Sequence, residues 1–152
     1  MTSLRRTAML ALTLLLVSVG ALRAADEIKV VVIAVLASED SKEVDPKLKC
    51  IADKVQKVEP KLTGFRLART TTRMVAVGRS DKFPLVDDEV VTVTLDRPAD
   101  EQNRVSVTVK PPNLGAIAYT SCCGKFFPIV TRYQTKKKER LIIAIMVETC
   151  NE

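Results

Sequence analysis

The amino-acid sequence predicts an α+β fold: one antiparallel-rich sheet or a small β-sandwich of about six to eight strands, with a single amphipathic helix packed on it. Three observations lead to this prediction. Residues 30–37 and 141–147 are two wholly apolar stretches near opposite ends of the chain. A single stretch, residues 46–62, repeats its apolar residues at helical spacing. The chain between these segments alternates apolar and polar residues in short runs separated by turns.

The two apolar stretches are predicted to be interior strands. A strand with one face in water alternates apolar and polar residues, whereas a strand apolar on both faces must be covered on both sides. Residues 30–33 are all β-branched, and Val35 adds a fifth, so extended backbone suits the first stretch better than helix. We expect residues 30–37 and 141–147 to be neighbours in one sheet.

Residues 1–24 have the pattern of a secretory signal peptide. Arg5 and Arg6 precede an apolar run at residues 9–19, and small residues lead to Ala24. The run is shorter than the roughly 20 apolar residues that span a bilayer. Cleavage after Ala24 leaves a single exported domain, residues 25–152, in the periplasm or outside the cell, with no transmembrane span; retention of the run as a membrane anchor is the alternative.

Charge and composition exclude several classes of function. Removing the leader takes away three arginines and no acid, so the net charge falls from +6 to +3, too little to indicate nucleic-acid binding. The chain contains no histidine, which excludes Ser-His-Asp and Cys-His catalysis and histidine-ligated zinc or iron sites. A chain of this size supports one core rather than two. We therefore expect one non-catalytic domain without a metal or cofactor.

The helix is expected to begin at Asp45, a capping residue, with Pro46 at its first position. It is predicted to run for about 14 residues and to end near Pro60 and Gly64. Its apolar stripe, which would cover one face of the interior strands, consists of Leu48, Ile51, Ala52, Val55, Val58 and Leu62.

The remaining strands are predicted from a period of two. The clearest is a hairpin in which Val91, Val93 and Leu95 pair with Val105, Val107 and Val109. Pro128 is expected at a sheet edge or a bulge, because proline cannot donate to a ladder. The other predicted strands are residues 65–69 and 74–77, with residues 70–72 continuing the first or forming a bulge, and residues 83–86, 117–121 and 126–133.

Four cysteines in an exported chain usually form disulfides, and four allow three connectivities. Cys50 lies off the helical stripe, on the solvated face, so its pairing with Cys150 is our first expectation. Cys122 and Cys123 are adjacent and point to opposite faces of a regular strand. Two alternatives are a soft-metal site and a redox-active thiol centred on Cys122-Cys123, although zinc and redox motifs normally have two-residue spacers.

A basic cluster is predicted at the tip of the last hairpin. It comprises Arg132, Lys136, Lys137, Lys138 and Arg140. Such charges can serve as gatekeepers beside an aggregation-prone strand. They can equally contact an anionic polymer or lipid head groups.

Three segments together carry a resemblance: IKVVVIAVLAS, the passage from DPKL to GFRL, and GKFFPIVTRYQTKKKERLIIAIMV. With the leader, they resemble small, secreted, β-rich proteins of unknown function from planctomycetes and myxobacteria. The resemblance covers most of the mature chain and implies no activity. The sequence thus favours a non-catalytic exported module that binds or scaffolds an envelope protein or an anionic polymer.

Overall fold

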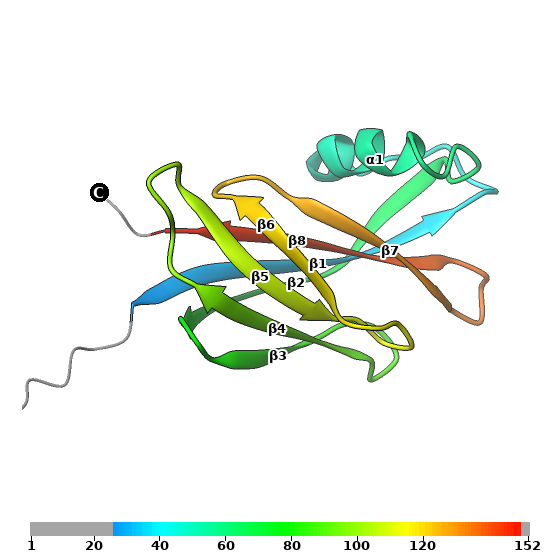
Figure 1. The fold of residues 1–152 in the computed structure, drawn as a ribbon. Coiled ribbons are helices and arrows are strands. Elements are labelled where there is room, and N and C mark those ends of the chain that lie inside the picture. Colours follow the sequence, from blue (N-terminus) through cyan, green and yellow to red (C-terminus); the bar gives the residue numbers. More distant parts are fainter. Residues whose placement is uncertain (1–25, 150–152) are drawn as a thin grey trace, which may run out of the picture.

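The computed structural model of the protein describes residues 26–149 and contains eight strands in two four-stranded antiparallel sheets, with one short α-helix (Figure 1). This sandwich-like α+β architecture confirms the predicted fold class. The first sheet has the order β2 (Gly64–Ala76), β1 (Glu27–Ser38), β8 (Arg140–Glu148), β7 (Phe127–Gln134). The second has the order β3 (Ser80–Pro84), β4 (Val90–Arg97), β5 (Arg104–Lys110), β6 (Ile117–Cys122).

The two apolar stretches are the central pair of the first sheet, as predicted. β1 and β8 run antiparallel, with Lys29 opposite Glu148 at one end and Ala37 opposite Arg140 at the other. Every residue from Val30 to Ala37 is buried. The pair therefore joins the two ends of the domain in one ladder, and the intervening chain covers both of its faces.

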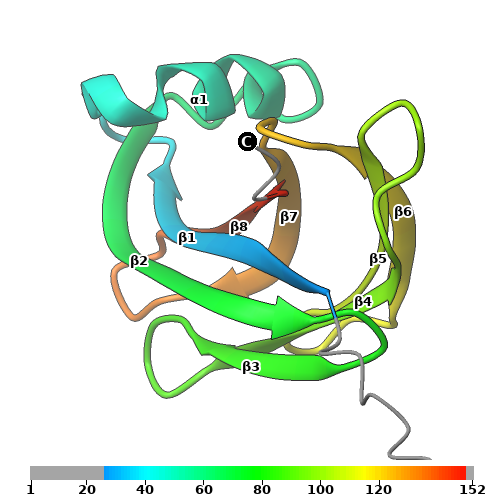
Figure 2. The ribbon, with the colours of Figure 1, turned by 90° about the vertical axis from the view of Figure 1, so that its left-hand side faces the viewer.

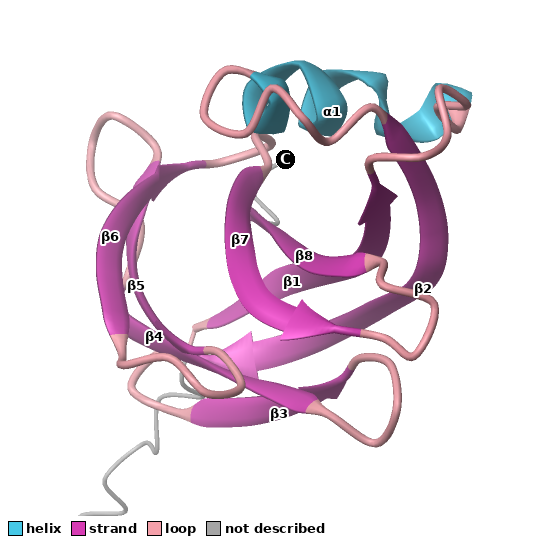
Figure 3. Ribbon diagram, turned by 90° about the vertical axis from the view of Figure 1, so that its right-hand side faces the viewer, coloured by secondary structure: helices cyan, strands magenta, loops and turns pink. Residues whose placement is uncertain are grey.

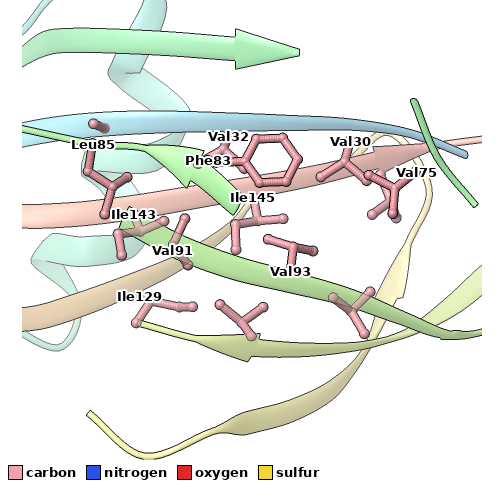
Figure 4. Close-up of a cluster of buried hydrophobic side chains, with 14 of the residues drawn as sticks. Val30, Val32, Val75, Phe83, Leu85, Val91, Val93, Ile129, Ile143 and Ile145 are labelled. Carbon is pink, nitrogen blue, oxygen red and sulfur yellow. The ribbon is translucent and has the colours of Figure 1, made fainter. Parts of the chain in front are cut away.

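One face of this sheet packs against the second sheet (Figure 2). The close-up in Figure 4 shows Val30, Val32 and Ile145 meeting Phe83, Val91 and Val93 across the interface. All six apolar residues predicted for the β4–β5 hairpin are fully buried. Because these residues alternate with threonine and serine, one face of the hairpin is buried and the other is solvated.

The opposite face of β1 and β8 packs against α1 (Lys49–Gln56) and the single 3₁₀ turn η1 (Pro46–Leu48) before it (Figure 3). Val35, Ala37 and Ile142 form this second core with Leu48, Ile51, Ala52 and Val55 of the helical segment. Asp45 caps the segment, since its Oδ1 accepts a hydrogen bond from the Lys47 amide at 2.9 Å. The predicted stripe thus explains why the central strands are apolar on both sides.

The helix is shorter than the sequence predicts. α1 ends at Gln56, and Val58, which we had placed in the stripe, is 70% exposed. The residue before a proline avoids the helical conformation, so Pro60 limits how far the helix can extend. Leu62 is nevertheless buried, because the chain turns back after the helix and Leu62 donates its amide to the Glu59 carbonyl.

The strands accommodate their irregularities, a bulge and two prolines, at an edge of the sheet or at a strand end. β2 is one continuous strand rather than two, and Ala68 is the extra residue of a bulge opposite Ala34 and Val35. Pro128 lies in β7, an edge strand, as predicted. β5 ends at Lys110, directly before Pro111. The central β1–β8 ladder of the first sheet is regular, whereas the β4–β5 ladder of the second sheet has a register shift between Leu95 and Arg97.

Candidate functional site

A groove of about 710 Å³ lies where β2, the β3–β4 turn and the β7–β8 turn come together. We call it the mouth groove. Figure 3 shows both turns on the same side of the molecule as β2. Its aliphatic lining comes from β1, β2, the β3–β4 connection and the first residue of β4: Leu36, Leu67, Ala68, Leu85, Val86 and Val90. The groove therefore has an aliphatic floor that is open to solvent.

One wall of the mouth groove carries positive charge. Arg66 and Arg69 come from β2, and Lys136 and Lys137 come from the β7–β8 turn. Arg66 forms a bidentate ion pair with Glu139, with Nε–Oε2 at 2.6 Å and Nη2–Oε1 at 2.8 Å. The hydrogen bonds from Arg66 hold the pKa of Glu139 below its usual range and raise that of Arg66. The pair fixes β2 to the β7–β8 turn.

The β3–β4 turn contributes acidic side chains to the lining, namely Asp87, Asp88 and Glu89. Asp87 and Asp88 both have positive φ (50° and 62°), and the Glu89 amide donates to the Val86 carbonyl at 2.9 Å. This is the left-handed turn geometry that suits a tight hairpin and that Asp tolerates. The Tyr133 hydroxyl of β7 donates to Asp87 Oδ2 at 2.7 Å and so connects the two sheets. Because Asp87 accepts this hydrogen bond, it favours the protonated hydroxyl and raises the pKa of Tyr133.

The predicted basic cluster is divided by the fold. Lys136 and Lys137 line the mouth groove, and Lys138 is exposed in the same turn with φ at 60°. Arg140 instead lies behind the turn, where its Nη1 is 3.7 Å from Oε1 of Glu59. Arg132 is exposed on β7. A contact of these five side chains with an anion remains a prediction, and only the two lysines share a groove.

Sequence reasoning did not group the other charged residues of the groove. Arg66 lies 73 positions from Glu139, and Asp87 lies 46 positions from Tyr133. Each residue by itself has the pattern of a solvated strand or turn. Only the antiparallel order β2-β1-β8-β7, with the second sheet beneath it, brings them to one end of the sandwich.

The described cysteines lie in three different environments. Cys50 is exposed on α1, as predicted, and Cys122 is exposed at the end of β6. Cys123 is partly buried in the following turn, where the Lys125 amide donates to the Cys122 carbonyl and Gly124 has φ of 78°. Among residues 26–149 no disulfide joins these three thiols. Cys150 lies outside the described residues, so its expected pairing with Cys50 remains a prediction.

Within that same part of the chain, no three cysteine, aspartate or glutamate side chains are grouped closely enough to hold a metal ion. Counting free thiols and measuring bound metal in the purified protein would test the alternative of a metal site on Cys122-Cys123.

Comparisons of the chain with protein-family models, curated proteins and solved structures give no match. No helix among the described residues is long and apolar enough to cross a membrane. The function must therefore be argued from the site itself. The mouth groove offers guanidinium, ammonium and carboxylate groups around an aliphatic floor, which is a set of groups for binding.

Proposed function

We propose that the chain is an exported, non-catalytic binding module of the cell envelope, and that the mouth groove holds an extended segment of a partner protein. The observation that carries the proposal is that cationic, acidic and aliphatic side chains together line one groove of about 710 Å³. The leader pattern of residues 1–24 supports export.

The charge arrangement favours a polypeptide over a uniform polyanion. The groove is lined by four cationic side chains and by four carboxylates, namely Asp87, Asp88, Glu89 and Glu139. A polyanion would gain from the lysines but would be repelled by the acidic turn. A peptide segment can present a carboxylate to the lysines, a basic group to the acidic turn and an apolar side chain to the floor.

Two side-chain contacts fix charged residues that line the groove. The Arg66–Glu139 pair orients a cationic side chain, and the Tyr133–Asp87 hydrogen bond orients an acidic one. A site whose side chains are already fixed loses less conformational entropy when a ligand binds. This geometry therefore suits recognition of a defined segment.

The direct test places a photo-crosslinking amino acid in the groove of the exported chain, in place of Val90. Val90 lines the groove and is 43% exposed, so the substitution has room. Val58 is the matched control, since it is an exposed valine just after α1 that does not line the groove. We expect a discrete crosslinked partner from position 90 and none from position 58.

A synthetic peptide of the crosslinked segment should then bind the purified chain, and charge reversal by Lys136→Glu with Lys137→Glu should weaken that binding about tenfold or more. Equal crosslinking from both positions, or peptide binding that ignores the charge reversal, would count against the proposal.

Retention on anionic surfaces tests the other candidate function, in which the hairpin tip binds polyanions or lipid head groups. If the tip instead binds polyanions or lipid head groups, replacing Lys136, Lys137 and Lys138 by Gln should reduce retention on phosphatidylglycerol vesicles or polyglutamate by about tenfold or more. Strong retention that depends on these lysines, combined with no crosslinked protein at position 90, would favour an anionic polymer or membrane as the partner.

Export is tested separately by sequencing the N-terminus of the protein recovered from the periplasm or medium. A start at Ala25 would support export with cleavage after Ala24. Recovery of the protein with residues 1–24 still attached and inserted in the membrane would favour the retained anchor instead.

A further inference from the structure

The mouth groove runs beside the outer edge of β2. β2 is an edge strand, and β1 is its one ladder partner among the described strands. Four consecutive residues of β2, from Arg66 to Arg69, line the groove. A ligand in the groove can therefore meet the backbone groups of a sheet edge as well as side chains.

One residue of the chain already pairs with this edge. Val44 forms an isolated parallel bridge with Phe65. The Phe65 amide donates to the Glu43 carbonyl at 2.9 Å, and the Phe65 carbonyl accepts a hydrogen bond from the Asp45 amide at 2.9 Å. The outer edge of β2 thus holds an extended segment at Phe65.

The next outward-facing position on this edge is Leu67. In an antiparallel ladder, every second residue turns its N–H and C=O groups to the same side of the strand. Phe65 turns these groups outward, so Leu67 does the same, just before the bulge at Ala68. Within residues 26–149, no backbone group is bonded to Leu67 on that side. Leu67 therefore offers a backbone donor and acceptor beside the groove.

The later part of β2 is held against β3. Arg73 Nη1 donates to Asp81 Oδ1 at 3.0 Å and to the Lys82 carbonyl at 2.7 Å. Figure 2 shows β2 beginning near α1 and ending beside β3. An added segment is thereby confined to the stretch between the Val44 bridge and Arg73, which is the stretch that lines the mouth groove.

The charge of β2 indicates the kind of segment that suits it. β2 contains three arginines and no acidic residue. Arg66 pairs with Glu139 and Arg73 with Asp81, whereas the exposed Arg69 has no ion-pair partner in the part of the chain that the structure describes. Pairing β2 with β2 of a second copy would bring arginines together, and like charges on paired strands are destabilising. An acidic segment would instead place a carboxylate beside Arg69.

We infer that the partner segment binds as an added β-strand, pairing its backbone with the outer edge of β2 at Leu67 and placing a carboxylate beside Arg69. The inference rests on the proposed function and specifies how the mouth groove recognises its partner. In this mode of recognition, main-chain hydrogen bonds supply affinity and alternate side chains supply specificity. The occupant is an extended segment of another protein in which apolar and charged residues alternate, at least one of them acidic.

The test titrates the purified protein with a capped probe peptide, Val-Glu-Val-Glu-Val-Lys-Val, and follows amide hydrogen exchange residue by residue. At saturation, exchange of the Leu67 amide should slow by about tenfold or more, because the peptide accepts its hydrogen bond. Phe65 is the internal control, since its amide is already bonded to the Glu43 carbonyl and its exchange should not change.

Two methylated probes distinguish strand addition from binding through side chains alone. In an extended peptide, the amides of the valines face one edge and those of the glutamates and lysine face the other. N-methylation of one set should weaken binding by about tenfold or more, whereas methylation of the other set should leave binding unchanged. Equal effects of the two methylated probes would overturn the inference.

A charge reversal tests the acidic contact. Arg69→Glu should weaken binding of the probe by about tenfold or more. Arg132→Glu is the matched control and should have no effect, because Arg132 is exposed on β7 and does not line the groove. Equal effects of the two substitutions would overturn the assigned contact.

The remaining outcomes separate this inference from the proposed function. Saturable binding without slower exchange at Leu67 would overturn strand addition and leave the proposed binding function standing. No binding of the probe would also overturn strand addition, while crosslinking from position 90 would still decide the proposed function. Slower exchange at Leu67 that grows with protein concentration, without peptide, would identify a second copy as the occupant and overturn the inference.

Discussion

Ile142 and Ile143 are adjacent in β8, both are fully buried, and their side chains enter different cores. Ile142 packs beneath the helix, and Ile143 packs between the two sheets (Figure 4). At the scale of the residue, this pair shows what an uninterrupted apolar run means physically. Each of these two side chains fills space in its own core. A polar group in place of either one would be buried without a hydrogen-bond partner.

Truncation of Ile143 to Ala should be among the most destabilising single changes in the chain. Removing a fully buried isoleucine side chain loses transfer free energy and leaves a cavity, so the free energy of unfolding should fall by about 2–5 kcal/mol. Equilibrium unfolding in urea measures this. Val58→Ala, at a 70% exposed position, is the control and should change stability by less than about 0.5 kcal/mol. A loss at residue 143 no larger than at residue 58 would contradict the two-core assignment.

The ion pair between Arg66 and Glu139 should contribute to stability in a pH-dependent way. Hydrogen bonding to Arg66 lowers the pKa of the folded Glu139. A lowered folded pKa means that the contribution is fully present above the unfolded pKa, about 4.3, and is lost as the pH falls through the folded pKa. Its size should be below about 1 kcal/mol, because Arg66 is largely exposed.

The measurement compares wild type with Glu139→Gln by urea unfolding at several pH values. The stability difference should be constant near neutral pH and should shrink below about pH 4.3. In an Arg66→Gln background the pH-dependent part of that difference should disappear. A difference that grows on acidification would show that the pair does not act through the carboxylate.

At the scale of the element, α1 is short, and its stability depends on the residues at its N-terminal end. An eight-residue helix is marginal by itself and is stabilised by packing and capping. Asp45 caps the 3₁₀ turn η1, which leads directly into α1, through its bond to the Lys47 amide, whereas Leu48 at the start of α1 makes no side-chain cap bond. Asp45→Ala should therefore reduce the free energy of unfolding by about 1 kcal/mol. Asp53→Ala, at an exposed site later in the same helix, is the control, and an equal loss at both sites would exclude a capping role.

The elements also show which patterns a sequence reveals. The β4–β5 hairpin and β8 were predictable because each has a strong sequence pattern. Apolar residues recur at every second position in the hairpin, and β8 is an unbroken apolar run. The predicted helix was too long because Val58 matches a helical spacing. Pro60 disfavours the helical conformation just before it, and the helix ends earlier. Residues 70–72 continue the strand, which was one of the two predicted alternatives, and the bulge lies at Ala68, where the sequence offers no distinctive residue.

The mouth groove belongs to the scale of the whole molecule, which is why the sequence could not indicate it. Its walls come from β2 and from two turns, and contacts such as Arg66–Glu139 form only after both sheets are assembled. The sequence predicted a charged tip at Lys136, Lys137 and Lys138. It did not predict that the acidic turn at residues 87–89 lines the same groove as two of these lysines, which changes the kind of ligand that suits them.

The last prediction concerns how the whole domain opens. β1 and β8 are covered on one side by the second sheet and on the other by α1, and they are hydrogen-bonded to a strand on each edge. Amides in such positions exchange with solvent only when most of the domain unfolds. By native-state hydrogen exchange, the amides of β1 and β8 should therefore be the slowest in the chain and should report the global free energy of unfolding.

The β4–β5 pair provides the internal comparison, because it is also central in a sheet but is buried on one face only. Its amides should exchange at least as fast as those of β1 and β8, and a Val107→Ala substitution should accelerate exchange in both sheets together, since Val107 lies in the core they share. If β4 and β5 kept their protection after β1 and β8 had lost theirs, the second sheet would be the more stable unit. The apolar ladder that links the two ends of the domain would then not be the part on which the rest of the fold depends.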